Sequence, residues 1–503
     1  MESLLLGLTL LVTTPLVLAA VGGVSWGVLG GALPGISPSI TMALVLPLTY
    51  GMEPGSAIVL LAATYVGAEY GGSIPAILIN TPGTNAAAAT VLDGYAMQRQ
   101  GRGGEALGIS LYSGVLGGLF GLTMLVVLTE PLARVALAFT PMAYFALGIL
   151  GLSIIASLSG ESLLKGLASG VLGLMVATVG SDPVSGVPRF VFGRPELLDG
   201  IAPILIMVGL FAVSELYQQA SAAEWRKTAG AETRLRFPDG ALRRRLIKPQ
   251  ILGATIGTLE GVMPGAGGTI ASFMSYNEAR RWSRHKEEFG HGSPEGVAAP
   301  ETANNTVAAT ALVPVLSFGI PGSNSAAILL GGLLVHGLIP GPRLFEENAD
   351  VVVALYTGLF VANLSLLFIG LLILPVCLWL VNRPKAYLMA FIYALIFSGV
   401  YSIDHSLFDV ALVLVVGVAG VFMRLAGLPM LPAVLGVVLG YMIESNYRRS
   451  LVLSGGDHGI FIEDAIALGL LSTAMLFIAG SLTTRAYLFV RRRRRQSERA
   501  ADG

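Results

Sequence analysis

Charged residues are scarce in this chain, and their scarcity excludes an ordinary soluble protein. Only 12% of the 503 residues are charged, against roughly 25% in a soluble domain. Hydrophobic residues make up 54%, and the mean hydropathy is +0.75. The polar surface is too small for a water-soluble fold of this length. We therefore expect the lipid bilayer to be the solvent of this protein.

Cysteine, histidine and net charge are also low. The single cysteine, Cys377, excludes an internal disulfide framework and a thiolate metal cluster. The five histidines form no H-E-x-x-H motif, and no Walker A sequence is present, which excludes ATP hydrolysis through a P-loop. A net charge of zero favours no nucleic-acid partner. We predict no cofactor and no metal other than Na⁺, and we expect Na⁺ or H⁺ to be the coupling ion.

Apolar stretches of spanning length occur along the whole chain. Each has close to the ~20 residues that cross the hydrocarbon core as a helix. The N-terminus lacks a basic n-region, so we interpret Leu4–Val21 as a retained span rather than a cleaved signal. The clearer spans are Leu107–Leu128, Val135–Ser157, Leu163–Val179, Ile201–Leu216, Val351–Leu380, Ala386–Ser402, Leu407–Met423, Leu428–Ile443 and Ala465–Val490.

Four further apolar regions are interrupted by Pro-Gly pairs. Proline removes a backbone donor and glycine permits positive φ, so each pair predicts a broken helix. Such breaks persist at membrane depth only inside protein or beside a water-filled cavity. The pairs are Pro34-Gly35, Pro82-Gly83, Pro264-Gly265 and Pro321-Gly322.

The two halves of the chain share one pattern. Pro75–Ala88 and Pro314–Ala327 have six identical residues at a constant separation of 239, and Thr84 aligns with Ser323. Pro34-Gly35 aligns with Pro264-Gly265 at 230. An ordered series of matches at nearly constant separation indicates a duplication.

Basic residues predict that the two copies are inverted in the membrane, because cytoplasmic loops are rich in Lys and Arg. The central linker and the five arginines at 491–495 are placed in the cytoplasm, and the basic loop Asp93–Ala106 then falls there too. Its counterpart, Gly337–Asp350, is acidic and falls outside. Four arginines at 189, 194, 448 and 449 fall outside against the rule.

We therefore predict an all-α polytopic membrane protein made of two inverted repeats with broken or re-entrant helices and about 11–14 membrane segments. The predicted parts are a first repeat (1–217), a basic cytoplasmic linker (218–249), a second repeat (250–446), a periplasmic loop with an extra span (447–490) and a basic cytoplasmic tail (491–503).

The Pro-Gly breaks predict a binding site for an anion. Thr84-Asn85 and Ser323-Asn324 follow two of them, and Ser, Thr and Asn are preferred helix N-caps. A helix N-terminus carries partial positive charge and free N–H groups. Two such ends at a pseudo-twofold axis would hold an anionic solute. The candidate substrate-binding residues are Asn80, Pro82, Gly83, Thr84, Asn85, Gly319, Pro321, Gly322, Ser323 and Asn324.

A coupling cation is also expected. Moving a negative charge inward against the membrane potential costs ~2.3 kcal/mol per 100 mV. Carboxylates near the breaks are proton or cation candidates, and the alternative is that they are hydrated at the interfaces. The candidate ion-coupling residues are Pro34, Gly35, Glu69, Glu260, Pro264, Gly265, Glu301, Asn304 and Asn305.

Two other functions compete with a carrier. Gly23-Val-Ser25-Trp-Gly27 matches the G-x-S-x-G pattern of serine hydrolases. Chance accounts for this match in a chain with 64 glycines, and the strand–turn–helix context is missing, so we expect no enzyme. The second alternative is a channel, because broken helices also occur in channels, or another membrane carrier that works without a binding protein.

The motifs together resemble the large membrane subunit of the bacterial tripartite tricarboxylate transporters, over nearly the whole chain. They are 31–35 (GALPG), 65–74 (YVGAEYGGSI), 78–83 (LINTPG), 92–95 (LDGY), 261–267 (GVMPGAG), 295–305 (EGVAAPETANN), 319–323 (GIPGS) and 337–342 (GLIPGP).

The resemblance implies an ion-driven secondary carrier in the bacterial inner membrane. It further implies a small membrane subunit of about four spans and a periplasmic solute-binding protein that delivers a carboxylate. Elevator-like motion is a hypothesis suggested by the wider group. The resemblance does not fix the carboxylate, and tricarboxylates, dicarboxylates and other organic anions all fit.

Overall fold

Helices make up most of the chain that the structure describes. The computed structural model describes residues 14–158, 162–182, 185–221, 234–263, 267–381 and 383–501. Seven helical segments in these ranges are long and apolar enough to cross a membrane, and five shorter apolar helices accompany them. The predicted all-α polytopic fold is therefore confirmed. The expected span Leu4–Val21 lies partly outside the described residues, which begin within α2 (Thr14–Gly31).

The helices follow the same order in the two copies. In the first copy, α2 is followed by α3 (Pro38–Val45), η1 (Leu46–Thr49), α4 (Pro54–Gly71), α5 (Ser73–Ile79), α6 (Ala88–Arg99), α7 (Gly103–Ala136), α8 (Pro141–Leu158), α9 (Leu163–Ala177), η2 (Pro195–Leu197), α10 (Pro203–Met207), the π-helix η3 (Val208–Val213) and α11 (Ser214–Ser221). Two short strands, β1 (Gly180–Ser181) and β2 (Pro188–Arg189), pair antiparallel with Gly180 opposite Arg189.

The second copy consists of α12 (Gly240–Val262), α13 (Gly267–Trp282), η4 (Lys286–Glu288), α14 (Pro294–Thr310), α15 (Leu312–Phe318), α16 (Asn324–Val335), α17 (Pro342–Glu347), α18 (Ala349–Leu372), α19 (Leu374–Val381), α20 (Lys385–Asp404), α21 (Leu407–Leu425) and α22 (Met430–Leu453). The chain continues through α23 (Ile460–Glu463) and α24 (Ala465–Ala501). The expected linker 218–249 thus includes the end of α11 and the first turns of α12.

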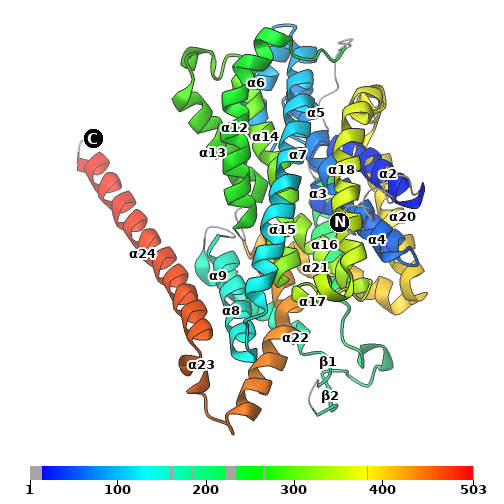
Figure 1. The fold of residues 1–503 in the computed structure, drawn as a ribbon, viewed down its shortest axis with the longest axis vertical. Helices are drawn as coiled ribbons and strands as arrows, with labels where there is room; N and C mark the ends of the chain where they lie inside the picture. The colour runs from blue at the N-terminus through cyan, green and yellow to red at the C-terminus, as the bar shows by residue number, and fades with distance from the viewer. Residues whose placement is uncertain are drawn as a thin grey trace. The chain divides into compact units, whose positions relative to one another are not determined.

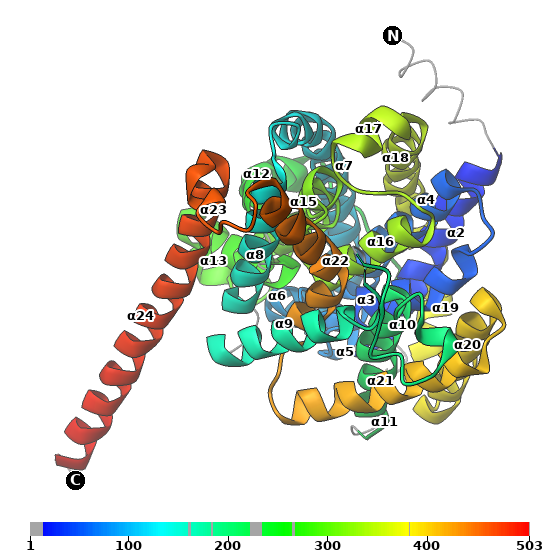
Figure 2. The ribbon, with the colours of Figure 1, turned by 90° about the horizontal axis from the view of Figure 1, so that it is seen from below.

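The chain forms two compact units, and each takes helices from both copies. Unit 1 holds the described residues up to Leu137 together with Ile204–Val421, and unit 2 holds Ala138–Pro203 and the residues from Phe422 onward. In unit 1, α14 packs against α7 and α12, and the three helices run side by side (Figure 1). Figure 2 shows α16 beside α3 and α4, which it contacts.

Contacts between the copies in unit 1 are reciprocal. Helix α7 of the first copy packs on α14 of the second, and α18 of the second packs on α4 of the first. In the same way, α6 contacts α13 and α16 contacts α3. A twofold relation between two copies produces paired contacts of this kind.

Glycine ladders bring the helices of each copy into close contact. Gly23, Gly27 and Gly31 of α2 face α4, where a Cβ added at Gly27 would lie 2.3 Å from the Thr64 carbonyl oxygen. Gly253, Gly257 and Gly261 of α12, each 230 residues later, face α14 in the same way. Small residues at a crossing allow two membrane helices to approach closely. The ladder also explains the G-x-S-x-G match, because its glycines are packing positions.

Helix α7 separates the basic segments of unit 1 from its acidic loop. At its first turns, the Arg236 N–H donates to the Gly104 carbonyl at 2.8 Å, which brings the end of the linker against the basic loop. Near its other end, the Ser317 hydroxyl donates to the Thr129 carbonyl at 3.1 Å, and α17 in the acidic loop contacts α7. The 34 residues of α7 span about 50 Å, more than the thickness of the hydrocarbon core.

In unit 2, ion pairs bind two of the arginines that break the charge rule. Arg189 bonds both carboxylate oxygens of Glu444, at 2.7 and 3.1 Å, and also lies 3.2 Å from Asp182. Arg448 pairs with the same two carboxylates. These ion pairs hold the two arginines in place but leave them as exceptions, because the rule counts Lys and Arg rather than net charge.

Candidate functional site

The two loops that follow α5 and α15 have the same backbone geometry. Asn80 ends α5 with φ 59° and ψ 30°, and Gly319 ends α15 with φ 71° and ψ 22°. The next N–H then donates to the carbonyl of a proline six residues back, from Thr81 to Pro75 at 3.3 Å and from Ile320 to Pro314 at 3.2 Å. This closure is one residue wider than the Schellman motif and, like that motif, places one left-handed residue at the end of the helix. The sequence match between the two loops therefore extends to their backbone geometry.

Each loop buries its glycine and exposes an asparagine. Gly83 donates to the Gly72 carbonyl at 3.0 Å, and a Cβ on Gly83 would lie 2.1 Å from the Gly31 carbonyl oxygen. Only glycine fits there. Asn85 and Asn324, which occupy equivalent positions, are both exposed. Among the other candidates, Thr84, Pro321 and Gly322 are buried, Pro82, Gly319 and Ser323 are half-buried, and Asn80 is exposed.

The helix caps agree with the prediction in one copy and differ in the other. Ser323 caps α16 as expected, its hydroxyl accepting from the Ala326 N–H at 3.1 Å. Thr84 accepts from the Ala87 N–H at 3.2 Å, but α6 begins only at Ala88. The reason is a tight turn before the helix, in which the Ala88 N–H donates to the Asn85 carbonyl.

Helices α4 and α14 connect the two loops through buried polar side chains. The Asn304 amide donates to a Glu69 carboxylate oxygen at 3.0 Å, with both side chains in the protein interior. Asn304 Oδ1 faces Gly268 at the start of α13, and Gly268 also lies against Ala86 of the first loop. One turn from Glu69, the Tyr65 side chain lies close to Ser323 in the second loop. The Glu69–Asn304 pair therefore lies between the two loops.

Glu301 forms a second buried group. The carboxylate is 1% exposed and accepts from Ser73 of α5, Thr90 of α6 and Ser110 of α7. All three hydroxyls belong to the first copy, whereas Glu301 belongs to the second. Asn305, one turn further along α14, donates to the Glu301 carbonyl at 2.9 Å.

The remaining ion candidates lie apart from these two groups. Gly35 takes positive φ (81°) in the turn between α2 and α3, as its Pro-Gly pair predicts. Pro264 and Gly265 lie outside the described residues. Glu260 is buried near the end of α12, and no hydrogen bond found in the described ranges joins it to Glu69 or Glu301.

Sequence reasoning missed several buried polar residues. Ser73, Thr90 and Ser110 are single hydroxyls in apolar segments, and only the carboxylate that they bind identifies them. Asp93 is fully buried, and its Oδ1 accepts 2.8 Å bonds from the N–H groups of Gly290, Gly292 and Ser293. The sequence showed Asp93 only as part of a motif.

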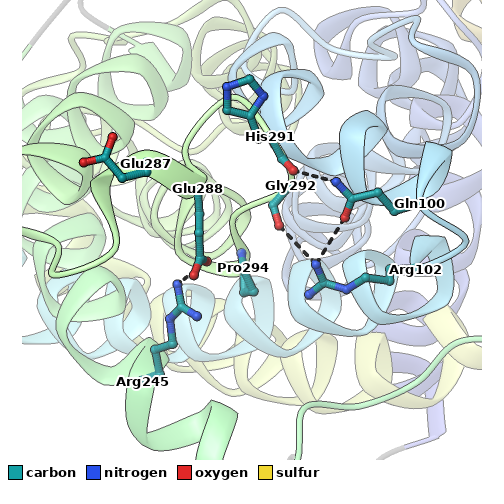
Figure 3. Close-up of a pocket in the computed structure, with 8 residues that line it drawn as sticks. All are labelled: Gln100, Arg102, Arg245, Glu287, Glu288, His291, Gly292 and Pro294. Carbon is teal, nitrogen blue, oxygen red and sulfur yellow. Dashed lines mark hydrogen bonds and ion pairs between the residues drawn. The ribbon is translucent and has the colours of Figure 1, made fainter.

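A cavity of about 570 Å³ lies beside the Asp93 anchor, and its polar lining comes from both copies. Figure 3 shows Arg102 and Gln100 of the first copy reaching the backbone of His291 and Gly292, while Arg245 pairs with Glu288. Arg245 also binds Glu295 at 2.7 Å, in the first turn of α14. Arg102 pairs with Glu105 at 2.8 Å. Because both arginines bind carboxylates, this cavity is a bonded junction between segments rather than an open anion site.

Comparisons with known proteins place most of the chain in one group. The tripartite tricarboxylate transporter TctA family matches residues 17–435. A protein of Agrobacterium vitis, described as an uncharacterized 52.8 kDa protein in the TAR-I ttuC' 3'region, is 37% identical over 443 residues, 88% of each chain. A second A. vitis protein, described as an uncharacterized protein in the TAR-II ttuC' 3'region, is 35% identical over 224 residues, 44% of this chain and 92% of its own. No solved structure matches.

The breadth of the family match agrees with a fold in which both copies carry the same broken-helix loops. The chain belongs to the tripartite tricarboxylate transporter TctA family, whose members are the membrane permease components of tripartite transporters.

Proposed function

We propose that this permease imports a carboxylate, a tri- or dicarboxylate or a similar organic anion, across the bacterial inner membrane. The transport is driven by a Na⁺ or H⁺ gradient, and the chain works with a small membrane subunit and a periplasmic solute-binding protein. The observation that carries the proposal is the matched pair of loops, each with an exposed asparagine, connected through Glu69 and Asn304.

The chemistry of the loops suits a carboxylate better than a cation. Each loop leads into the N-terminus of a 12-residue helix, where backbone N–H groups and the helix dipole favour negative charge. The asparagine amides at 85 and 324 add donors. No lysine or arginine occurs in residues 75–92 or 312–333. The anion is therefore held by dipoles and amides, and its charge is offset by co-transported cations.

The proposed orientation places the central linker and the C-terminal tail in the cytoplasm, with the two copies inverted. The arrangement around α7 supports it. The basic loop and the end of the linker lie at one end of α7, and the acidic loop with α17 lies at the other. The reciprocal contacts between the copies agree with a twofold axis lying in the membrane plane.

Uptake of radiolabelled citrate into proteoliposomes tests the proposal, with the small subunit and the binding protein present. Asn85→Ala and Asn324→Ala are each expected to raise the KM for citrate about tenfold, as loss of one hydrogen bond to a charged group predicts. Thr255→Ala is the matched control, because the exposed Thr255 hydroxyl bonds only its own helix at the Ile251 carbonyl.

The alternative functions give different results. Uptake that continues without an ion gradient and does not saturate would identify a channel. Wild-type KM values in both asparagine variants would remove the loops from the binding site. A panel of dicarboxylates and other organic anions in the same assay then identifies the substrate.

A further inference from the structure

The polar atoms that surround the buried Glu301 carboxylate are all hydroxyl oxygens. Ser73 Oγ lies 2.7 Å from both carboxylate oxygens, and Ser110 Oγ lies 3.0 Å from Oε2. Thr90 binds Oε1. Two carboxylate and three hydroxyl oxygens therefore meet inside unit 1, supplied by four different helices.

Nothing basic neutralises this carboxylate in the described part of the chain. The ion pairs found there all involve other carboxylates. An ionised carboxylate in a protein interior costs several kcal/mol unless a counter-charge accompanies it. Each hydroxyl uses its single proton on the carboxylate, so the cluster offers only lone pairs to a further ligand. A cation fits this surplus of acceptors, and an anion does not.

Asn305 supplies a second, independent observation. It is 1% exposed, and its Oδ1 is buried without a hydrogen-bond donor among the described residues. Asn305 lies one turn from Glu301 on the face of α14 that packs on α7. There Asn305 meets Gly114, one turn from Ser110. A buried acceptor without a donor costs about 1–3 kcal/mol, which a bound cation or its water would recover.

We propose that Glu301 and the hydroxyls of Ser73, Thr90 and Ser110 bind the coupling cation, and that this cation is Na⁺. The proposal rests on the transport function proposed above. Oxygen ligands suit hard cations, and a shell with one carboxylate matches one positive charge. No group of three or more His, Cys, Asp and Glu side chains suited to a multivalent metal occurs in the described residues.

The site also provides a coupling mechanism. Ser73 begins α5 and Thr90 lies in the first turn of α6, so these helices flank the loop that carries Asn85. A cation held by both hydroxyls and by Glu301 ties the two flanks of this loop to α14. Binding of Na⁺ then stabilises the loop conformation that receives the carboxylate, and the carboxylate increases Na⁺ affinity by the same factor.

Binding of Na⁺ to the purified full-length chain in detergent tests the site without any carboxylate present. The measurements are ²²Na⁺ binding by scintillation proximity and the apparent unfolding temperature in NaCl against choline chloride at equal ionic strength. We expect saturable, stabilising binding to wild type. Ser73→Ala and Ser110→Ala should each raise the apparent Kd for Na⁺ about tenfold, and Glu301→Gln should abolish binding.

Ser113→Ala is the matched control, because Ser113 lies on α7 one turn from Ser110 and its hydroxyl accepts from Gln250 instead. The proposal is overturned if Na⁺ binds neither wild type nor variants, or if Ser73→Ala and Ser110→Ala behave like Ser113→Ala. Ser73→Ala and Ser110→Ala keep the test valid even if Glu301→Gln fails to fold. Citrate uptake driven by a pH gradient without Na⁺ would leave the transport function standing and refute the Na⁺ site.

Discussion

Asn80 and Gly319, 239 residues apart, end equivalent helices in the same left-handed backbone conformation. Asparagine and glycine are the residues that adopt this conformation most readily. In each copy, this conformation leads the backbone into a Pro-Gly loop. A residue that does not readily adopt it should therefore disturb the loop itself, whether or not a ligand is bound.

Substitution of Asn80 separates backbone strain from side-chain chemistry. Asn80→Val should destabilise the protein by about 1–2 kcal/mol, because a β-branched residue resists positive φ. Asn80→Gly should retain wild-type stability. The apparent unfolding temperature in detergent measures both, and Gly319→Val is expected to reproduce the loss in the second copy. Equal stability of Asn80→Val and wild type would contradict the strain argument.

Asp93 is expected to anchor the segment between η4 and α14. Its Oδ1 accepts three N–H bonds, and its Oδ2 accepts from the Tyr276 hydroxyl at 2.9 Å. Asp93→Asn replaces a charged acceptor with a neutral amide and should cost about 1.5–3 kcal/mol. Limited trypsin digestion after Lys286 should become faster in this variant.

Tyr276→Phe is the milder comparison, because it removes one bond to Asp93 and leaves the other three intact. We expect cleavage at an intermediate rate. An anchoring role for Asp93 is refuted if Asp93→Asn digests no faster than Tyr276→Phe.

The two ends of α7 should lie on opposite sides of the membrane. In a Cys377→Ser background, Arg99→Cys and Glu346→Cys each introduce one exposed cysteine. A membrane-impermeant maleimide added to intact spheroplasts should label the cysteine at 346 and not the one at 99. Permeabilisation should allow both to react, and the background protein should remain unlabelled. Labelling of position 99 in intact spheroplasts would reverse the proposed orientation.

Substitution of a ladder glycine in α2 should impair folding more than substitution of Ser25, which lies between two of these glycines. The Ser25 hydroxyl donates to the Val21 carbonyl of its own helix at 2.8 Å, so Ser25→Ala should leave folding and uptake unchanged. Gly27→Leu should reduce the yield of folded protein, because its side chain would overlap the α4 backbone. Gly22→Ala is the matched control, since a Cβ there meets nothing within 4 Å. A hydrolytic activity lost in Ser25→Ala would favour the enzyme alternative.

Sequence patterns predicted the fold class, the helix breaks and the duplication. Composition indicates the solvent, a Pro-Gly pair interrupts the helix in which it occurs, and a repeat can be recognised by aligning the sequence with itself. Sequence patterns also identified Glu69, Asn304 and Glu301 as candidates. They did not reveal that Asn304 bonds Glu69, or that Ser73, Thr90 and Ser110 converge on Glu301. These pairings join residues about 190–235 apart in the chain, and their geometry depends on how α4, α7 and α14 pack.

The Glu301 cluster has a consequence for how such a protein evolves and how it works. The position equivalent to Glu301 in the first copy is Ala62, and the position equivalent to Glu69 in the second is Ala308. The backbone repeats, but the charges do not. Neither half of the gene encodes a complete cluster, so the cluster forms only where the two halves of the chain pack together. In the carrier proposed above, the inward-facing and outward-facing states therefore need not be equal in energy, because the two copies repeat their helices but not their charges.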